Sequence, residues 1–283
     1  MSARGAPAML ALFGDPVDHS LSPVMQNAWL QDAGIAGIYT AMRIPTKEAA
    51  ATFAGLREMA LTGANVTVPH KEEAAKHVDR LDEAATALGA VNTLRWEADG
   101  AVSGFNTDAP GLIAALDASN TGWRSQAGAA LVIGAGGAGR AAAWALAHAG
   151  VRRVMICNRT AQRAQEAAAR IDKARPFPWA KLGETFESAD LIVNTTTLGM
   201  VHAPAMDWPI ARAPRHAIVM DAVYAPLETP LLAAAAARGM RTIDGLGMLI
   251  HQGALAFDIW FGVKPDVVAA RHRLLEAIAE REA

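Results

Sequence analysis

A glycine-rich stretch at positions 131–141 constrains the fold more than any other part of this 283-residue chain. Three apolar residues typical of a buried strand come first, and the spacing Gly134-x-Gly136-x-x-Gly139 follows. Gly134 permits a tight turn, Gly136 lets the backbone approach a pyrophosphate, and Gly139 lets the next helix lie close to the strand. Because a helix N-terminus also offers unpaired N–H groups to phosphates, the stretch predicts the start of a dinucleotide-binding βαβ unit.

The composition favours a globular protein that binds small molecules. Hydrophobic residues make up 52% of the chain, which is ample for two cores, and the net charge is −2. Because the chain has no basic run or stripe, we expect neither nucleic acid nor a membrane surface as a partner. The one cysteine, Cys157, ends an apolar run and is interpreted as a core residue. The apolar run at 8–13 is too short for a signal-peptide core, so we expect a cytoplasmic protein.

In the first half, apolar strands alternate with helical segments, which predicts a mostly parallel sheet. The Asp99-Gly100 pair predicts a hairpin whose antiparallel strands close this sheet at its edge. The polar segment 119–128 is interpreted as the passage into the second half. The expected strands are 9–13, 38–44, 64–68, 90–96 and 101–105, and the expected helices are 24–33, 47–60 and 110–116.

The second half continues the alternation around the glycine loop, which predicts a Rossmann-type doubly wound sheet. Two helical stretches, 248–261 and 265–282, end the chain, and we expect them to return to the first domain because the second sheet is already complete. The predicted fold class is therefore α/β with two domains. Residues 1–108 with 247–283 form a substrate-binding and catalytic domain, and 109–246 form the dinucleotide domain. The other expected elements are strands 131–133, 153–157, 191–193, 217–220 and 241–243 and helices 141–149, 161–171 and 230–238.

The residues after the second strand of the glycine-loop unit bear on the choice of cofactor. A carboxylate there suits the ribose hydroxyl of NAD, whereas arginine suits the 2′-phosphate of NADP. This chain has Asn158-Arg159-Thr160 and then Arg163, with no acidic residue before Glu166. Two guanidinium groups can bind one phosphate, although solvated arginines at a helix start are the structural alternative. We therefore predict NADP rather than NAD.

Polar side chains in the first half occur at strand ends and in loops, where α/β proteins place their sites. Ser20 and Ser22 follow the first strand. Ser22 is expected to be a helix N-cap, whereas Ser20 has no such structural role. Asn65 and Thr67 share one face of a strand, and Lys71 follows the break in that strand.

Two further polar stretches, Asn92-Thr93 and Asn106-Thr107-Asp108, complete this set. A lysine and an aspartate held together can relay a proton to a substrate oxygen, which makes Lys71 and Asp108 candidate catalytic residues. The structural alternatives are a solvated lysine and a helix cap. The histidines lack ligand spacing, so no metal site is expected.

Seven stretches in this order resemble the shikimate dehydrogenase family, and the resemblance covers residues 9–275. The stretches are Gly14–Pro23, Gly63–Lys71, Ala90–Thr93, Gly104–Asp108, Gly134–Gly139, Asn158–Thr160 and Asp244–Gln252.

The resemblance implies NADP-dependent interconversion of 3-dehydroshikimate and shikimate, in the pathway to the aromatic amino acids. It implies that Lys71 is the acid/base and Asp108 its partner, and that Ser20 and Ser22 hold the substrate carboxylate, which Tyr224 reaches from the other domain. The implied substrate-binding residues are Ser20, Ser22, Asn65, Thr67, Lys71, Asn92, Asp108, Tyr224 and Gln252. The implied cofactor-binding residues are Gly134, Ala135, Gly136, Gly137, Ala138, Asn158, Arg159, Thr160, Arg163, Thr195, Ala222, Gly245 and Met248.

One departure from the family pattern keeps an alternative open. Gln26 stands where many members have histidine, a change also found in the quinate/shikimate branch. A quinate/shikimate dehydrogenase with relaxed cofactor use is therefore the alternative enzyme, and a ligand-sensing module without turnover is the alternative from another class. The oligomeric state expected is monomer or homodimer.

Overall fold

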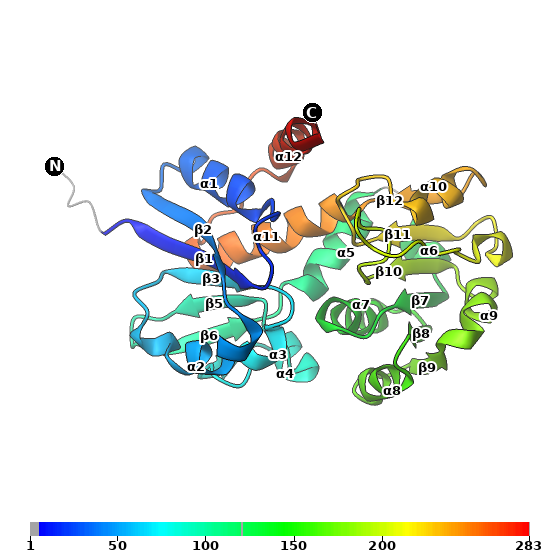
Figure 1. The fold of residues 1–283 in the computed structure, drawn as a ribbon, viewed down its shortest axis with the longest axis horizontal. Helices are drawn as coiled ribbons and strands as arrows, with labels where there is room; N and C mark the ends of the chain where they lie inside the picture. Colours follow the sequence, from blue (N-terminus) through cyan, green and yellow to red (C-terminus); the bar gives the residue numbers. More distant parts are fainter. Residues whose placement is uncertain (1–5, 120, 283) are drawn as a thin grey trace. The chain divides into compact units, whose positions relative to one another are not determined.

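The computed structural model describes residues 6–119 and 121–282, and the chain divides into two compact units. The first unit comprises Met1–Thr107 and Gln252–Ala283, and the second comprises Asp108–His251. Each unit contains a six-stranded sheet with helices packed against it, so the predicted α/β class with two domains is confirmed (Figure 1). The expectation about a leader segment concerns residues that include 1–5, and these lie outside the described part of the chain.

The first unit has a mixed sheet with the strand order β2-β1-β3-β5-β6-β4. The predicted hairpin is confirmed, since β5 and β6 pair antiparallel. The prediction that this hairpin closes the sheet is wrong, because β4 pairs in parallel with the outer side of β6. A strand of two residues is too short for an alternating pattern to be detected in the sequence. The strands are β1 (Ala8–Gly14), β2 (Gly37–Arg43), β3 (Gly63–Val66), β4 (Arg80–Leu81), β5 (Thr93–Trp96) and β6 (Val102–Phe105).

Helices cover both faces of this first sheet, as Figure 1 shows for α1 and α11 on one side and α2, α3 and α4 on the other. A buried cluster that includes Phe13, Phe53 and Leu94 joins the sheet to α2, α3 and α4. The single helix predicted at 47–60 is wrong, because Gly55 interrupts it and short 3₁₀ turns lie on both sides of α2. The helices are α1 (Ser22–Asp32), α2 (Ala49–Ala54), α3 (Lys71–Ala74), α4 (Glu83–Leu88) and α12 (Val267–Glu282), and α11 (Gly245–Phe261) begins in the second unit and ends in the first.

The start of α1 differs from the predicted cap. The N-cap residue is Leu21, which makes no side-chain cap bond, and Ser22 is already helical. The hydroxyl of Ser20 accepts a hydrogen bond from the Ser22 N–H at 3.2 Å. The N-cap lies one residue earlier than predicted, and Ser20 rather than Ser22 supplies a side-chain acceptor at this helix start.

The last helix, α12, is bonded both to the end of α1 and to the segment that precedes α1. Arg273 donates two hydrogen bonds to Asp32, the last residue of α1, at 2.6 and 3.1 Å. Arg281 donates to the carbonyl oxygens of His19 and Ser20, at 2.9 and 3.4 Å. The C-terminal helix therefore orders the backbone that carries Ser20.

The second unit has a fully parallel sheet with the order β12-β11-β10-β7-β8-β9. Counted from β7 as the first strand, this is the Rossmann order 3-2-1-4-5-6, and its topological switch point lies between β7 and β10. Strand β9 was not predicted, because two prolines interrupt its pattern on the sheet edge. The strands are β7 (Ala129–Ile133), β8 (Arg153–Asn158), β9 (Ala174–Pro178), β10 (Leu191–Asn194), β11 (Ile218–Asp221) and β12 (Arg241–Ile243).

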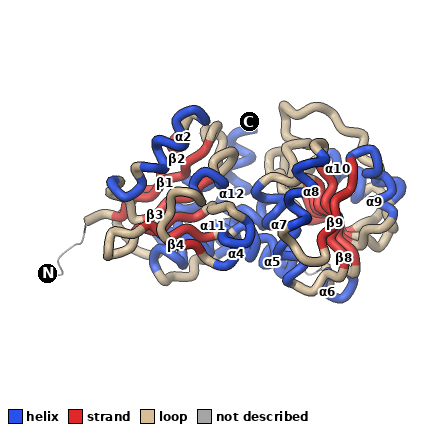
Figure 2. Tube along the Cα trace, turned by 90° about the horizontal axis from the view of Figure 1, so that it is seen from below, coloured by secondary structure: helices blue, strands red, loops and turns tan. Residues whose placement is uncertain are grey.

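Helices flank both faces of this second sheet, as the red strands and blue helices of Figure 2 show. One buried cluster joins Phe186 of α9 and Leu231 of α10 to Cys157 and its neighbours on the strands. Cys157 is a core residue as predicted, and burial raises the pKa of its thiol to about 11. The predicted passage 119–128 contains a short helix, and its residue 120 lies outside the described residues. The helices are α5 (Asp108–Ala118), α6 (Trp123–Gln126), α7 (Gly137–His148), α8 (Ala161–Ala169), α9 (Leu182–Glu187) and α10 (Pro230–Ala236).

A buried carboxylate joins the ends of β10 and β11. Asp221 accepts hydrogen bonds from Asn194 Nδ2 at 2.9 Å, from the Val223 N–H at 3.0 Å and from Thr229 Oγ1 at 2.7 Å. Asn194 in turn bonds to Thr196 and to the carbonyl of Leu198. Burial raises the pKa of Asp221 to about 6, and these hydrogen bonds oppose the rise.

The raised pKa of Asp221 predicts that the free energy of unfolding depends on pH. Because the folded-state pKa of Asp221 exceeds its ordinary value of 3.8, the folded protein binds the proton more tightly than the unfolded chain. The resulting stabilisation is present below pH 3.8 and is lost as the pH rises through about 6. Relative to Asp221→Asn, the wild type should lose up to about 3 kcal/mol between these limits. Urea unfolding of both proteins across this range measures the difference, and a constant difference would show that the group does not titrate there.

Within residues 6–119 and 121–282, none of the helices has the length and apolarity needed to cross a bilayer.

Candidate active site

Asn92, which lies between α4 and β5, is the centre of a buried polar network in the first unit. Its backbone carbonyl accepts from the Val66 N–H at 2.9 Å and from Asn65 Nδ2 at 3.1 Å. Its side-chain oxygen accepts from the Thr107 N–H at 2.7 Å, and its Nδ2 donates to Thr107 Oγ1 at 2.9 Å. Nδ2 also donates to Gln252 Oε1 of α11 at 3.3 Å. The structure therefore brings together Asn65, Asn92 and Gln252, three of the residues expected to bind substrate.

The side-chain amide of Asn65, near the C-terminal end of β3, is held in one orientation. Its Nδ2 donates both hydrogens, to the Asn92 carbonyl and to Thr93 Oγ1, each at 3.1 Å. Its Oδ1 accepts from the Tyr39 hydroxyl at 2.8 Å. Because a carbonyl oxygen cannot donate, the Asn92 carbonyl excludes the flipped amide. Both donor hydrogens of the Asn65 amide are thus used within the protein, and Oδ1 retains acceptor capacity.

Ser20 and Ser22 lie at the start of α1, where Ser20 is partly exposed and Ser22 is buried. The Ser22 N–H donates to Ser20 Oγ, and the Ser22 side chain is close to the Tyr39 hydroxyl, whose pKa it acts to lower. Ser22 is therefore a neighbour of the Tyr39–Asn65 pair.

Lys71 is the first residue of α3, and its carbonyl accepts from the Val91 N–H at 2.9 Å. This bond fixes the backbone of Lys71 beside the residue that precedes Asn92. Thr67 lies just beyond β3 rather than within it, and its N–H donates to the Phe13 carbonyl at 2.8 Å. Asp108 is the first residue of α5 and directly follows Thr107 of the network. Asp108 belongs to the second unit, whereas the other residues named here belong to the first.

Three further residues belong to this network: Thr93 and Thr107, which lie in the predicted polar stretches but were assigned no role of their own, and Tyr39, which was not predicted. All three are buried. Thr93 and Thr107 stand beside the predicted Asn92 and Asp108, so adjacency to a polar cluster was the available signal. Tyr39 lies in an alternating strand pattern and is indistinguishable there from a core aromatic residue.

Two residues close to the network have internal roles. His70 is buried, with its Nε2 at 2.7 Å from the Ile44 carbonyl and its ring edge-on to Phe53, so it packs inside the first unit. Gln26 is buried in α1 and donates to the Gly253 carbonyl of α11 at 3.1 Å. Gln26, the residue that departs from the family pattern, therefore contacts α11 next to Gln252.

The glycine loop in the second unit has the geometry that its spacing predicts. Gly134 has φ +110°, and a Cβ on Gly139 would lie 2.2 Å from the Gly134 carbonyl oxygen. A Cβ on Gly136 would meet nothing within 4 Å, so the space above this backbone is open. Helix α7 begins at Gly137, not at the predicted residue 141, and its N-cap Gly136 makes no side-chain cap bond. The loop and the twelve-residue helix therefore fit a pyrophosphate.

Two polar side chains support this loop from within the unit. Thr195 Oγ1 donates to the Ile133 carbonyl at 2.8 Å and lies 2.9 Å from the position of a Cβ on Gly139. Asn158 Oδ1 accepts from the Ala135 N–H at 3.2 Å, and its Nδ2 donates to the Thr160 carbonyl at 2.9 Å. Of the threonines at 195–197, Thr195 packs beneath both Gly134 and Gly139, and Thr196 packs against Gly134.

Arg159 and Arg163 are exposed, one just after β8 and one in the first turn of α8. Glu166, the first acidic residue after them, accepts a hydrogen bond from Gln162 at 2.8 Å. The end of β8 therefore presents positive charge, as the sequence predicts for a 2′-phosphate site.

The remaining predicted residues lie where β11 and α11 meet within the second unit. A Cβ on Gly245 would lie 2.4 Å from the Ala222 carbonyl oxygen, so the start of α11 packs closely against the segment after β11. Met248 is buried in the first turns of α11, and Tyr224, three residues beyond β11, is partly exposed.

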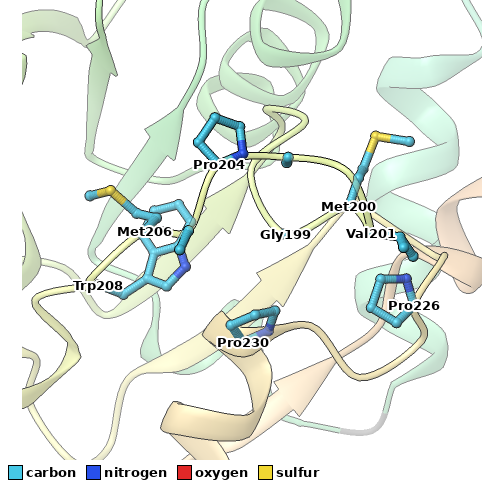
Figure 3. A pocket seen from close by; sticks show the side chains of 10 residues that line it. Gly199, Met200, Val201, Pro204, Met206, Trp208, Pro226 and Pro230 are labelled. Atoms are coloured by element: carbon cyan, nitrogen blue, oxygen red, sulfur yellow. The ribbon is translucent and has the colours of Figure 1, made fainter.

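A separate pocket of about 280 Å³ lies between the loop after β10 and the start of α10 (Figure 3). None of its lining side chains carries a charge, so these described residues offer no counter-charge to a carboxylate or a phosphate. The lining residues are Gly199, Met200, Val201, Ala203, Pro204, Ala205, Met206, Trp208, Pro226 and Pro230.

The fold and the loop together define a protein with a Rossmann-type dinucleotide unit and a second α/β unit that carries a buried polar site. Comparison with known families gives three matches: "Shikimate dehydrogenase substrate binding domain" over residues 12–94, "Shikimate / quinate 5-dehydrogenase" over 117–206, and "Shikimate 5'-dehydrogenase C-terminal domain" over 245–275.

Individual relatives agree with these matches. A protein of Azorhizobium caulinodans named shikimate dehydrogenase (NADP(+)) is 45% identical over 95% of both chains. The shikimate 5-dehydrogenase of Thermus thermophilus, solved in complex with NADP(H) and shikimate, has a TM-score of 0.86 and 39% identity over 95% of this chain and 99% of the other. The quinate dehydrogenase of Corynebacterium glutamicum, solved with NAD, has a TM-score of 0.87 and 30% identity over the same shares of the two chains. The chain belongs to the shikimate dehydrogenase family.

The glycine loop yields a matched pair of predictions. Gly136→Ala should leave the free energy of unfolding unchanged, because the added Cβ meets no atom. It should weaken dinucleotide affinity by about tenfold or more, because the Cβ then stands where the backbone approaches the pyrophosphate. Gly139→Ala should instead destabilise the fold by about 1–3 kcal/mol, since its Cβ meets a backbone oxygen. Urea unfolding and NADP⁺ titration of both variants measure these effects, and similar stability losses in the two would contradict the distinction.

Proposed function

We propose that this chain is an NADP-dependent shikimate dehydrogenase that interconverts 3-dehydroshikimate and shikimate. The observation that carries the proposal is the Asn92 network, which gathers amide and hydroxyl groups from separate segments of the first unit. Such an array suits a small polyhydroxylated acid, because each substrate hydroxyl needs a donor and an acceptor. The name and the 45% identity of the Azorhizobium relative support the choice of shikimate, and the lower identity of the NAD-bound quinate dehydrogenase disfavours the quinate alternative.

The substrate is proposed to lie with its carboxylate at Ser20 and Ser22 and its ring hydroxyls toward the Asn92 network. Asn65 accepts from a hydroxyl through Oδ1, because its amide hydrogens are used elsewhere. Tyr224, from the loop after β11, is a second ligand of the carboxylate. The hydroxyl-binding residues proposed beside Asn65 are Thr67, Lys71, Asn92, Asp108 and Gln252.

Proton transfer is assigned to Lys71, with Asp108 as the residue that orients it. In oxidation, Lys71 takes the proton from the reacting hydroxyl group of shikimate, and in reduction it returns the proton to the carbonyl oxygen. When bound, NADP⁺ accepts the hydride that leaves the same carbon atom. The residues around the substrate hold the reacting hydroxyl at Lys71, so that the proton leaves from one position.

The cofactor is proposed to bind to the second unit, with its pyrophosphate at the glycine loop and its 2′-phosphate at the end of β8. The backbone of Gly134–Ala138 and the start of α7 contact the pyrophosphate, and Arg159 and Arg163 bind the 2′-phosphate with Asn158 and Thr160. The nicotinamide ring is assigned to the side formed by Thr195, Ala222, Gly245 and Met248.

The two units are assigned different tasks. Substrate binding is assigned to the first unit and cofactor binding to the second, whose boundaries lie one residue from the predicted 108/109 and five residues from the predicted 246/247. We propose that the enzyme acts in the cytoplasm, since a buried unpaired cysteine is suited to a reducing compartment, and that it works without nucleic acid as a monomer or a homodimer.

Initial rates with shikimate and quinate, each with NADP⁺ and NAD⁺, test this function. The highest kcat/KM is expected for shikimate with NADP⁺. Arg159→Ala should raise the KM for NADP⁺ by about tenfold or more and leave that for NAD⁺ unchanged, because one charge-assisted phosphate contact is lost. Comparable rates with both acids would establish the broader quinate/shikimate activity. Tight NADP⁺ binding without turnover would instead support the ligand-sensing alternative.

Lys71 provides a test of the proton-transfer assignment. Lys71→Ala should lower kcat by roughly 10²–10⁴, the range for loss of a general acid/base. The control is Lys76→Ala, because Lys76 is exposed just beyond α3 and bonds to Glu73 at 2.7 Å. Stopped-time assays with saturating shikimate measure both variants, and a loss below about tenfold in Lys71→Ala would remove it from the mechanism.

A further inference from the structure

Tyr39 lies on β2, the edge strand of the first sheet, yet its side chain is 1% exposed. Asn27 of α1 replaces the missing strand neighbour: its Oδ1 accepts from the Tyr39 N–H at 2.8 Å, and its Nδ2 donates to the Tyr39 carbonyl at 2.9 Å. The Tyr39 ring packs against Trp260 of α11, with the ring centres 6.2 Å apart. Helix α1 thus fixes the backbone of Tyr39, and helix α11 fixes its ring.

The hydroxyl of Tyr39 lies near two proposed substrate ligands. It donates to Asn65 Oδ1 at 2.8 Å, near the C-terminal end of β3, and the Ser22 side chain at the start of α1 is close to it. Burial raises the pKa of Tyr39 above its usual range, and the nearby Ser22 opposes this effect. The phenol therefore stays neutral and keeps the proton that it donates.

The direction of these hydrogen bonds follows from the Asn92 carbonyl. Since that carbonyl only accepts, Asn65 must present Nδ2 to it and Oδ1 to Tyr39. The Tyr39 proton is then used on Asn65, so the phenol oxygen can only accept from the Ser22 hydroxyl. One directed series runs from Tyr39 through Asn65 to Asn92.

We propose that Tyr39 is a positioning residue for the substrate: it sets the spacing between Ser22, at the carboxylate end of the site, and the Asn65–Asn92 pair, at the ring-hydroxyl end. This role rests on the proposed function, because it requires a ring that carries a carboxylate and hydroxyl groups to span the two ends. Tyr39 itself contacts no substrate. It acts by holding one orientation of the Asn65 amide and by placing its oxygen close to the Ser22 hydroxyl.

Tyr39→Phe tests the proposal, because it removes the hydroxyl and keeps the ring that packs on Trp260. The KM for shikimate should rise by about tenfold, the effect of losing one buried hydrogen bond, while kcat stays within about threefold. The Kd for NADP⁺ should not change, because the glycine loop belongs to the other unit.

Trp96→Phe is the matched control in the same unit. Trp96 Nε1 donates to the Leu56 carbonyl at 2.7 Å, and its ring packs on the cluster at the opposite face of the sheet. This variant should lose stability and keep the wild-type KM. A Tyr39→Phe protein that is destabilised to a similar degree but keeps the wild-type KM would overturn the positioning role. If the wild type itself does not oxidise shikimate, the proposed function fails first.

A second route remains if Tyr39→Phe does not fold. The chain has two tyrosines, so in a Tyr224→Phe protein the only one is Tyr39. Replacing it biosynthetically with 3-fluorotyrosine makes the phenol a stronger donor to Asn65 without removing it. The KM for shikimate should change by about twofold or more relative to the same variant with ordinary tyrosine. An unchanged KM would contradict the proposal.

Discussion

The buried carbonyl of Asn92 is the interaction on which the proposed substrate site depends. It accepts from the Val66 N–H and from Asn65 Nδ2 at the same time, and so it joins β3 to the start of β5. An unsatisfied polar group at such a buried place costs about 1–3 kcal/mol, so the surrounding side chains have one arrangement in which every group is paired. The orientation of Asn65 and the direction in which Tyr39 donates its proton both follow from it.

The second unit repeats this principle with a carboxylate. Asp221 and Asn194 join the ends of β10 and β11, and their hydrogen bonds extend to Thr229 on one side and to Thr196 on the other. Gly199, with φ +107°, packs against Asp221 and Thr229, so the loop after β10 closes over this pair. In both units a buried polar anchor lies at the carboxyl ends of strands, where α/β folds place their ligands.

Features determined by local chemistry could be predicted from the sequence. Each glycine of the loop has a steric purpose that its spacing reveals, and Asn65 and Asn92 stand out as amides at strand ends. Tyr39 could not be predicted, because its role depends on Asn27 and Asn65, which pattern analysis does not bring together. The N-cap was misplaced by one residue because the backbone angles of Leu21 decide it. Strand β9 was missed because tertiary pairing, not local propensity, forms it.

The central claim is that hydrogen bonds to Tyr39 and Asn92 fix the Asn65 side chain before the substrate binds. Both amide hydrogens of Asn65 are then bonded within the protein, and only Oδ1 can contact the substrate. A crystal structure of the shikimate complex tests this claim most directly. The account predicts that Asn65 Nδ2 keeps its bonds to the Asn92 carbonyl and Thr93 Oγ1, at about the 3.1 Å found here, and that shikimate meets Asn65 only at Oδ1. A shikimate oxygen within hydrogen-bonding distance of Asn65 Nδ2, with either of those bonds broken, would contradict it.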